Sequence, residues 1–202
     1  MPKSTPPSKQ QYLTALKSEV ETNIFYHCLA LETCMGAIYD YLAQNKLLKK
    51  DEPSKDDWLL AGLIHDIDYG PKTKEKHLKL TKQVLSHHRL EVSDTVFQII
   101  LAHGPQISDV HPQSQAQWAI YCADSLTGLI VAVALVYPSK KLADVKLSSI
   151  VKRFHKEPRF AAGTRRDQVA QCAHPDNLDI PVDKFIEICF SAMQSIAPQI
   201  SL

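Results

Sequence analysis

One short stretch limits the fold of this chain more than any other. An apolar run at 59–64 leads into the adjacent pair His65 and Asp66, with Asp68 two positions later and a Gly-Pro pair after that. Apolar runs of this kind form buried helices, and Gly-Pro is a typical helix stop. Ionisable side chains buried among leucine and isoleucine are costly unless something compensates them. A divalent metal bound by both an imidazole and a carboxylate is one compensation. The alternative is a helix end at which the aspartate simply faces water.

The bulk composition fits one soluble domain. The chain has 202 residues, of which 45% are hydrophobic and 22% charged, so it is long enough to bury a substantial core. The formal net charge of +1 gives no overall attraction to nucleic acid or to a membrane surface. Any partner must therefore be recognised by a local group of residues.

The cysteines and the N-terminal segment lead us to expect a cytoplasmic protein. The five cysteines are scattered, odd in number and never spaced as C-x-x-C. This pattern favours reduced thiols over a disulfide framework or a cysteine zinc site. Residues 1–12 are expected to form a flexible tail, because the first ten are rich in proline, serine and lysine and lack the apolar core of a signal peptide.

The most hydrophobic segment, 119–137, is predicted to be the central buried helix and not a membrane span. Its purely apolar part, 129–136, is far shorter than a bilayer crossing. The segment also contains Asp124 and several small polar residues. We therefore expect no membrane association.

Helical periodicity extends over nearly the whole chain, and neither a β-hairpin nor a glycine-rich phosphate loop is evident. The predicted helices are 14–46 (one or two helices), 58–66, 73–89, 96–103, 114–137, 146–155, 164–172 and 183–197. We expect an all-α, single-domain helical bundle over 13–202, with its motifs within 23–136 and C-terminal helices over 144–199. Apolar stripes on the first and last helices could serve either the core or a homodimer.

Six ionisable residues fall on apolar faces of these predicted helices. They are His27, His65, Asp66, His77, His103 and Asp124. Asp124 is the most informative, because it is the only charge in the most hydrophobic helix and buried carboxylates are rarely left unpaired. Each histidine taken singly could be an ordinary core residue, and His87 or His88 could take the place of His77.

The order of these residues resembles the HD-domain superfamily of metal-dependent phosphohydrolases. That family carries a histidine, an adjacent His-Asp pair and a distal aspartate on a bundle of helices; here these are His27, His65-Asp66 and Asp124. The segments 61–68 and 121–126 resemble the family's core motif and its distal aspartate helix. The region after 136 resembles uncharacterised bacterial HD proteins. The chain lacks the Gly-Tyr-Pro signature of the cyclic-dinucleotide phosphodiesterase branch.

The resemblance implies a metal site between the central helices. His27, His65, Asp66 and Asp124 would hold a first metal, and Asp66 could bridge to a second one held by His77 and His103. The last two histidines resemble those of binuclear branches, which include small bacterial enzymes that cleave diadenosine tetraphosphate. Such nitrogen and carboxylate ligands suit Mn, Fe, Co, Ni or Zn, as one ion or two.

Catalytic and substrate-binding roles are expected for four further residues. Asp68 is a candidate for orienting water or shuttling a proton beside His65 and Asp66, with a simple turn residue as the alternative. Nine basic residues lie within 140–166, and a basic rim would suit an anionic phosphate. Lys152, Arg165 and Arg166 are the candidate substrate contacts; the alternative is a solvated charged face.

The leading functional hypothesis is metal-dependent hydrolysis of a phosphate ester or anhydride in a small molecule, with a nucleotide as the expected substrate. One alternative is a binuclear-iron oxygenase, since some HD-fold proteins hold two irons with a similar ligand set. Another is a non-catalytic module that binds a structural metal or senses a ligand. Clustered aromatic residues for base stacking are not evident, so a long nucleic acid is not expected as a partner.

Overall fold

A computed structural model describes residues 7–202, and all regular structure in that range is helical. The α-helices are α1 (Lys9–Glu19), α2 (Thr22–Gln44), α3 (Lys55–Ile64), α4 (Thr81–His87), α5 (Asp94–Leu101), α6 (Pro105–Ser108), α7 (Gln115–Val136), α8 (Leu147–Lys156), α9 (Arg166–Ala170) and α10 (Val182–Ser195). Short 3-10 helices are η1 (Lys74–Lys76), η2 (Leu142–Asp144), η3 (Gln171–Ala173) and η4 (Ala197–Ile200). The predicted all-α class is confirmed.

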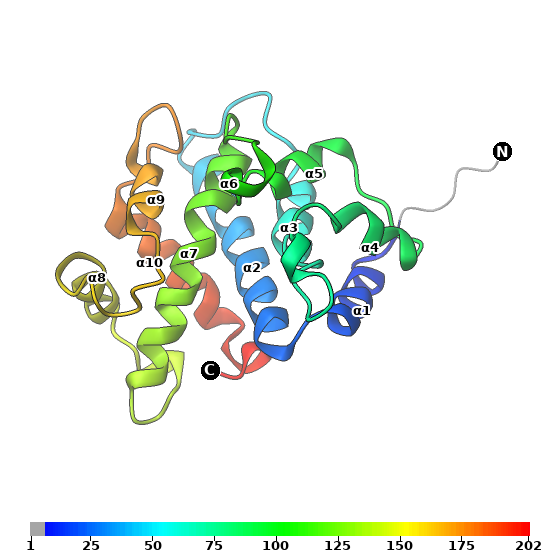
Figure 1. The fold of residues 1–202 in the computed structure, drawn as a ribbon. Coiled ribbons are helices and arrows are strands. Elements are labelled where there is room, and N and C mark those ends of the chain that lie inside the picture. The colour runs from blue at the N-terminus through cyan, green and yellow to red at the C-terminus, as the bar shows by residue number, and fades with distance from the viewer. Residues whose placement is uncertain (1–6) are drawn as a thin grey trace.

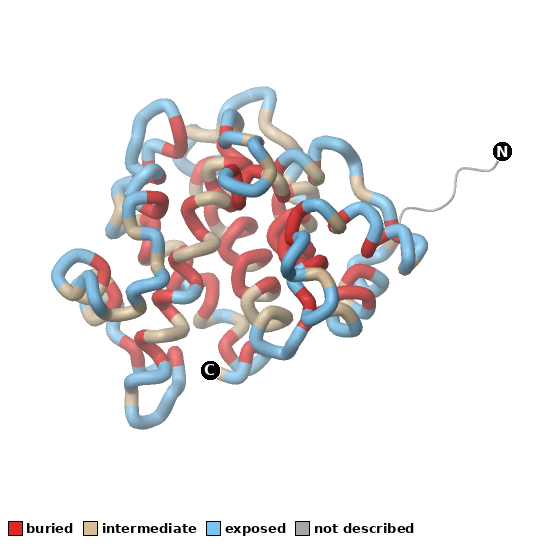
Figure 2. The backbone as a smooth tube through the Cα atoms, viewed as in Figure 1, coloured by how far each residue is buried: buried red, intermediate tan, exposed pale blue. Residues whose placement is uncertain are grey.

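Helix α2 lies at the centre of the molecule and packs against α3, α7 and α10 (Figure 1). Its buried residues follow the helical spacing expected from the sequence: Cys28, Leu31, Met35, Ile38 and Leu42. Figure 2 shows buried stretches in the middle of α2 and along α7, with exposed loops around them. The hydrophobic effect along these faces therefore holds the central helices in place.

Helix α3 crosses α2 at a point where only glycine fits. A Cβ atom on Gly62 would lie 2.9 Å from the Glu32 Cα atom, which is closer than real Cβ contacts come. The helix begins after Ser54, which forms a capping box with Asp57. This close crossing brings the C-terminal end of α3, where His65 follows, against the middle of α2.

Helix α7 is the predicted central apolar helix. It begins at Ser114, whose side chain accepts a hydrogen bond from the Gln117 backbone N–H. By length and composition it is the one helix among residues 7–202 that could span a membrane, but 56% of its apolar window is buried inside the protein. A core helix that is buried inside a protein can have the same length and apolar composition as a membrane span.

The predicted N-terminal segments are revised by the structure. The expected 14–46 region forms two helices, α1 and α2, separated by a break near Val20. Helix α1 begins at Lys9, inside the segment 1–12 that the sequence predicts as a tail, because Ser8 and Gln11 form a capping box and Tyr12 is buried. The part of the predicted tail at residues 1–6 lies outside the described residues.

The predicted helix over 73–89 is wrong as one continuous element. The chain forms η1, turns at Leu78 with a φ angle of 66°, and resumes as α4. The imidazole of His77 binds Asp68, and Asp68 also accepts a hydrogen bond from the Leu80 backbone N–H. These contacts hold the break in place and turn His77 toward the interior.

The C-terminal third covers the outer face of α7. Helix α9 packs on α7, while α8 and α10 close the side of the bundle (Figure 1). Arg166 donates hydrogen bonds to the backbone carbonyls of four residues of the segment before it: Arg153, Phe154, Glu157 and Phe160. The loop 157–165 is therefore fixed over α7, next to Asp124.

Candidate metal centre

The structure brings together all six residues that the sequence singles out as ligands, from five parts of the chain. His27 projects from α2, His65 and Asp66 follow α3, His77 follows η1, His103 follows α5, and Asp124 projects from α7. Two groups among them have ligand atoms close enough to share an ion. These are His27, His65 and Asp66, and then Asp66, His77 and His103.

The first group surrounds one oxygen of Asp66. The Nε2 atoms of His27 and His65 are 3.1 Å apart. The Oδ2 atom of Asp66 lies 3.9 Å from the His27 Nε2 and 3.4 Å from the His65 Nε2. Asp124 joins this group, since its Oδ1 atom lies 3.0 Å from the His27 Nε2 and 3.9 Å from the His65 Nε2.

The second group surrounds the other oxygen of the same aspartate. The Nε2 atoms of His77 and His103 are 3.1 Å apart. The Oδ1 atom of Asp66 lies 3.4 Å from the His77 Nε2 and 3.6 Å from the His103 Nε2. Asp66 therefore stands between the two groups, with one oxygen facing each of them.

All four imidazoles are held through the Nδ1 atom, away from Asp66. His65 and His103 donate from Nδ1 to the backbone carbonyls of Gly62 and Ile100. His77 donates from Nδ1 to Asp68, and the Nδ1 atom of His27 lies 3.0 Å from the Thr127 hydroxyl. That hydroxyl donates its own hydrogen to the Asp124 carbonyl oxygen, so it accepts from His27. With the proton on Nδ1, each Nε2 atom is left with a lone pair.

Facing lone pairs repel each other, so these nitrogens need a cation between them. In each group two Nε2 acceptors face each other at 3.1 Å, beside a carboxylate that also has only lone pairs. Two nitrogens that bind one ion at about 2.1 Å and at right angles are about 3 Å apart, which matches this spacing. The donor set therefore fits one divalent transition metal in each group, with Asp66 shared.

The ionisation of His65 and of the two carboxylates agrees with this interpretation. Burial lowers the pKa of His65 to about 4, so its imidazole is neutral at neutral pH and able to coordinate. Burial acts to raise the pKa of Asp66 and Asp124, but the neighbouring histidines outweigh it. The pKa of Asp124 falls to about 2 and that of Asp66 falls well below its usual range. For His27 and His103, burial acts to lower the pKa, and the carboxylates of Asp124 and Asp66 reverse this to a net rise, so both carboxylates favour a positive charge at these imidazoles.

Asp68, expected from the sequence as a water-orienting or proton-shuttling group, is fully buried and fully engaged. Its Oδ1 atom accepts from the His77 Nδ1 atom at 2.8 Å. Its Oδ2 atom accepts from the Leu80 backbone N–H at 3.2 Å and from the Thr81 hydroxyl at 3.0 Å. With both oxygens occupied and no exposed surface, Asp68 is placed to orient His77 and not to exchange protons with water.

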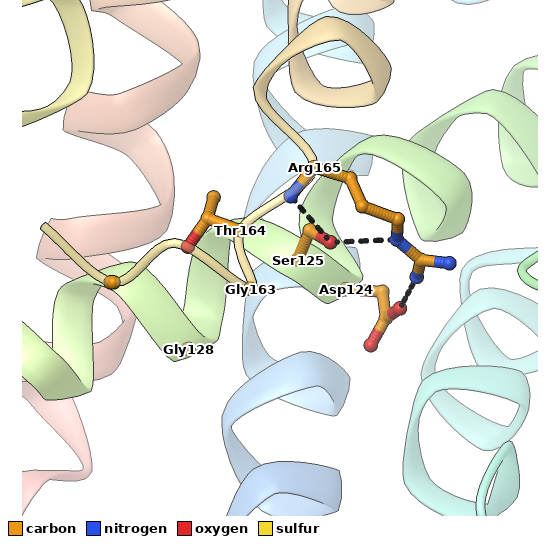
Figure 3. A pocket seen from close by; sticks show the side chains of 7 residues that line it. Asp124, Ser125, Gly128, Gly163, Thr164 and Arg165 are labelled. Atoms are coloured by element: carbon orange, nitrogen blue, oxygen red, sulfur yellow. Dashed lines mark hydrogen bonds and ion pairs between the residues drawn. The ribbon is translucent and has the colours of Figure 1, made fainter. Parts of the chain in front are cut away.

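The structure places the three candidate substrate contacts in different surroundings. Arg165 reaches the site: its Nη2 atom donates to the Asp124 Oδ2 at 2.9 Å and its Nε atom donates to the Ser125 hydroxyl at 3.1 Å (Figure 3). Arg166 is occupied with backbone carbonyls, as described above, and Lys152 pairs with Glu157 on the surface. Neither of these two lines the cleft over the metal centre.

The cleft over the centre has a volume of about 350 Å³. Its walls include Tyr69 and Ile107, which are 42% and 49% exposed, together with Arg165. Ser125 and Thr127, which hold Arg165 and His27, were not singled out in the sequence. Thr127 lies three residues after Asp124 on α7, and this spacing could have found it because residues three apart share a helix face. Ser125 carries no such signal, because adjacent helix residues do not share a face.

Comparisons with known proteins agree with this geometry. The family model of the HD domain matches residues 24–129, which is just over half of the chain and contains all six residues of the centre. No curated protein and no solved structure shows a significant match to the chain. On the family match, the chain belongs to the HD-domain family.

Proposed function

We propose that this protein is a metal-dependent phosphohydrolase that cleaves a phosphate ester or anhydride of a small molecule, with nucleotides as the first substrates to test. The proposal rests on one observation: Asp66 lies between two pairs of histidines, and the positively charged Arg165 lines the cleft beside them. Membership of the HD-domain family supports the same reaction class.

The ligand residues would hold two ions. His27, His65 and Asp124 would bind the first, His77 and His103 the second, and Asp66 both. Bound there, a divalent transition metal lowers the pKa of a coordinated water to near neutrality and polarises a phosphoryl oxygen. Mn, Fe, Co, Ni and Zn all suit such nitrogen and carboxylate donors.

The protein's own residues contribute position and charge. Each imidazole is fixed through Nδ1, so the four Nε2 atoms keep their direction without reorganisation during a reaction. The Arg165 guanidinium is half exposed and lies on the wall of the cleft, where its remaining N–H groups could bind phosphate oxygens. These features favour an anionic substrate over a neutral one.

The test begins with the metal content of the purified protein, followed by phosphate release from a panel of nucleotides and other phosphate esters by the Mn- or Co-loaded protein. We expect release that is abolished in His65→Ala and Asp124→Ala while both variants remain folded. His111→Ala is the matched control, since this exposed histidine does not line the cleft and its replacement should leave activity intact.

Three results would contradict the proposal in different ways. Two bound irons with oxygen consumption and no phosphate release would identify an oxygenase. Bound metal without turnover of any substrate would identify a structural or ligand-sensing module. A protein that takes up no metal at all would indicate that the six residues are ordinary buried side chains.

A further inference from the structure

A second cavity adjoins the cleft over the metal centre, along α7. It has a volume of about 390 Å³, and His27 and Ile24 line both this cavity and the metal cleft. Its other walls are largely apolar and include Tyr26, Val131 and Leu135, together with the segment 200–202. Cavities of this size, with apolar walls and a few polar groups, are typical of small-molecule sites.

One face of α7 forms the wall shared with the metal centre. Asp124, Gly128, Val131 and Leu135 are spaced by four, three and four residues, so they lie along one side of the helix. At a rise of about 1.5 Å per residue, Val131 lies about 10 Å along the axis from Asp124. Leu135, at the far end, is 51% exposed although it is a large apolar residue. An apolar strip therefore runs from the metal ligand to the surface.

Gly128 is the unusual residue in this strip. Glycine in a helix interior is less stable than alanine, and it is normally explained by a positive φ angle or by a close neighbour. Gly128 has neither: its φ angle is not positive, and a Cβ atom built on it would meet nothing within 4 Å. Gly128 lines the apolar cavity and also a neighbouring one that contains Asp124 and Arg165 (Figure 3). Gly128 is exposed, so a side chain at this position would project into the open space beside both cavities.

We propose that Gly128 is a specificity-determining residue that keeps this groove open for the nucleoside part of the substrate, while the phosphate lies at the metal centre beside Arg165. This inference rests on the proposed function and adds the place of the organic group. Val131, Leu135 and Ile24 supply apolar contact for a base or sugar face. Asn23 and Tyr26, whose hydroxyl accepts a hydrogen bond from the Ser201 hydroxyl, supply polar groups. Local departures from ideal helix composition of this kind are expected at functional sites.

The test fills the groove from Gly128. Gly128→Phe places a ring in the open space, and Gly128→Ala adds only a methyl group. Val136→Phe is the matched control, because it adds the same ring to the same helix at a 56% exposed position that does not line the groove. Metal content is measured for all three variants, so that damage to Asp124 is recognised.

With nucleoside monophosphates as probes, Gly128→Phe should lower kcat/KM at least tenfold, chiefly through KM. The loss should be smaller with p-nitrophenyl phosphate, so the ratio of the two activities falls. Val136→Phe should keep the wild-type ratio. Gly128→Ala should raise the melting temperature, since nothing opposes the added methyl group.

Binding gives a readout that does not depend on turnover. A nucleoside monophosphate should raise the melting temperature of the metal-loaded wild-type protein and of Val136→Phe, but not of Gly128→Phe. An unchanged activity ratio and an unchanged thermal shift in Gly128→Phe would overturn the groove assignment while leaving the hydrolase proposal intact. A wild-type protein that hydrolyses none of the probes but still binds them through Gly128 would overturn only the hydrolase proposal.

Discussion

The carboxylate of Asp68 holds the imidazole of His77 through a hydrogen bond of 2.8 Å to Nδ1, on the side away from Asp66. This buried pair fixes one of the two histidines that would hold the second ion. The same carboxylate accepts a hydrogen bond from the Thr81 hydroxyl, just after the turn at Leu78. Asp68 therefore links the local fold to the second half of the metal centre.

Replacing Asp68 with alanine should weaken binding of the second ion and leave the first in place. Loss of such an outer partner typically costs a factor of about 10–100 in metal affinity. Metal titration of the variant should show one unchanged and one weakened site, and excess metal should restore activity. A loss of activity that persists at saturating metal would instead support the proton-shuttle role.

Arg165→Gln should lower kcat/KM for a phosphate substrate by about 10–100-fold, because hydrogen bonds to charged groups are worth about 1.5–3 kcal/mol. The effect should appear mainly in KM, since the ligands of the centre remain. Lys152→Gln is the comparison, as this exposed lysine pairs with Glu157 and does not line the cleft. Equal kinetics for Arg165→Gln and the wild type would remove Arg165 from substrate binding.

Arg166→Ala should lower the free energy of unfolding more than it lowers the activity. Its guanidinium donates to four backbone carbonyls that hold the loop 157–165. Losing these partly buried hydrogen bonds should cost about 1–3 kcal/mol, which urea unfolding would measure. Direct substrate binding would be indicated if the variant kept full stability and lost activity.

The buried cysteines should make the protein less stable at alkaline pH. Burial raises the pKa of Cys172 to about 12 and raises those of Cys28, Cys122 and Cys189 well above the usual value. In the unfolded chain these thiols ionise near pH 8.5, so above that pH the unfolded state binds fewer protons and the folded state loses stability. The free energy of unfolding should fall from about pH 8 upward. Cys122→Ala should flatten this slope, and an unchanged slope would contradict the assignment.

Much of the fold and the centre could be predicted because both depend on local patterns. The predicted helices 96–103, 114–137 and 183–197 correspond to α5, α7 and α10. The ligand positions were predictable because ionisable residues on apolar helix faces are costly to bury unless something compensates them. The structure then shows that these residues meet.

The remaining features depend on contacts between distant segments. The turn at Leu78 follows from the hydrogen bonds of Asp68, which periodicity cannot reveal. Arg165 and Arg166 are adjacent in sequence, yet one reaches the metal centre and the other binds backbone carbonyls, because the loop 157–165 folds back over α7. The open space at Gly128 likewise appears only when the helices are assembled.

The central claim is that Asp66 joins two metal sites on this chain. Counting the ions bound per protein molecule, by elemental analysis after loading with Mn or Co and removal of free metal, tests it most directly. We expect two ions in the wild type, one in His77→Ala and one in His27→Ala, with the smallest content in Asp66→Ala. A wild-type protein that binds no ion, or variants that bind as many ions as the wild type, would contradict the account.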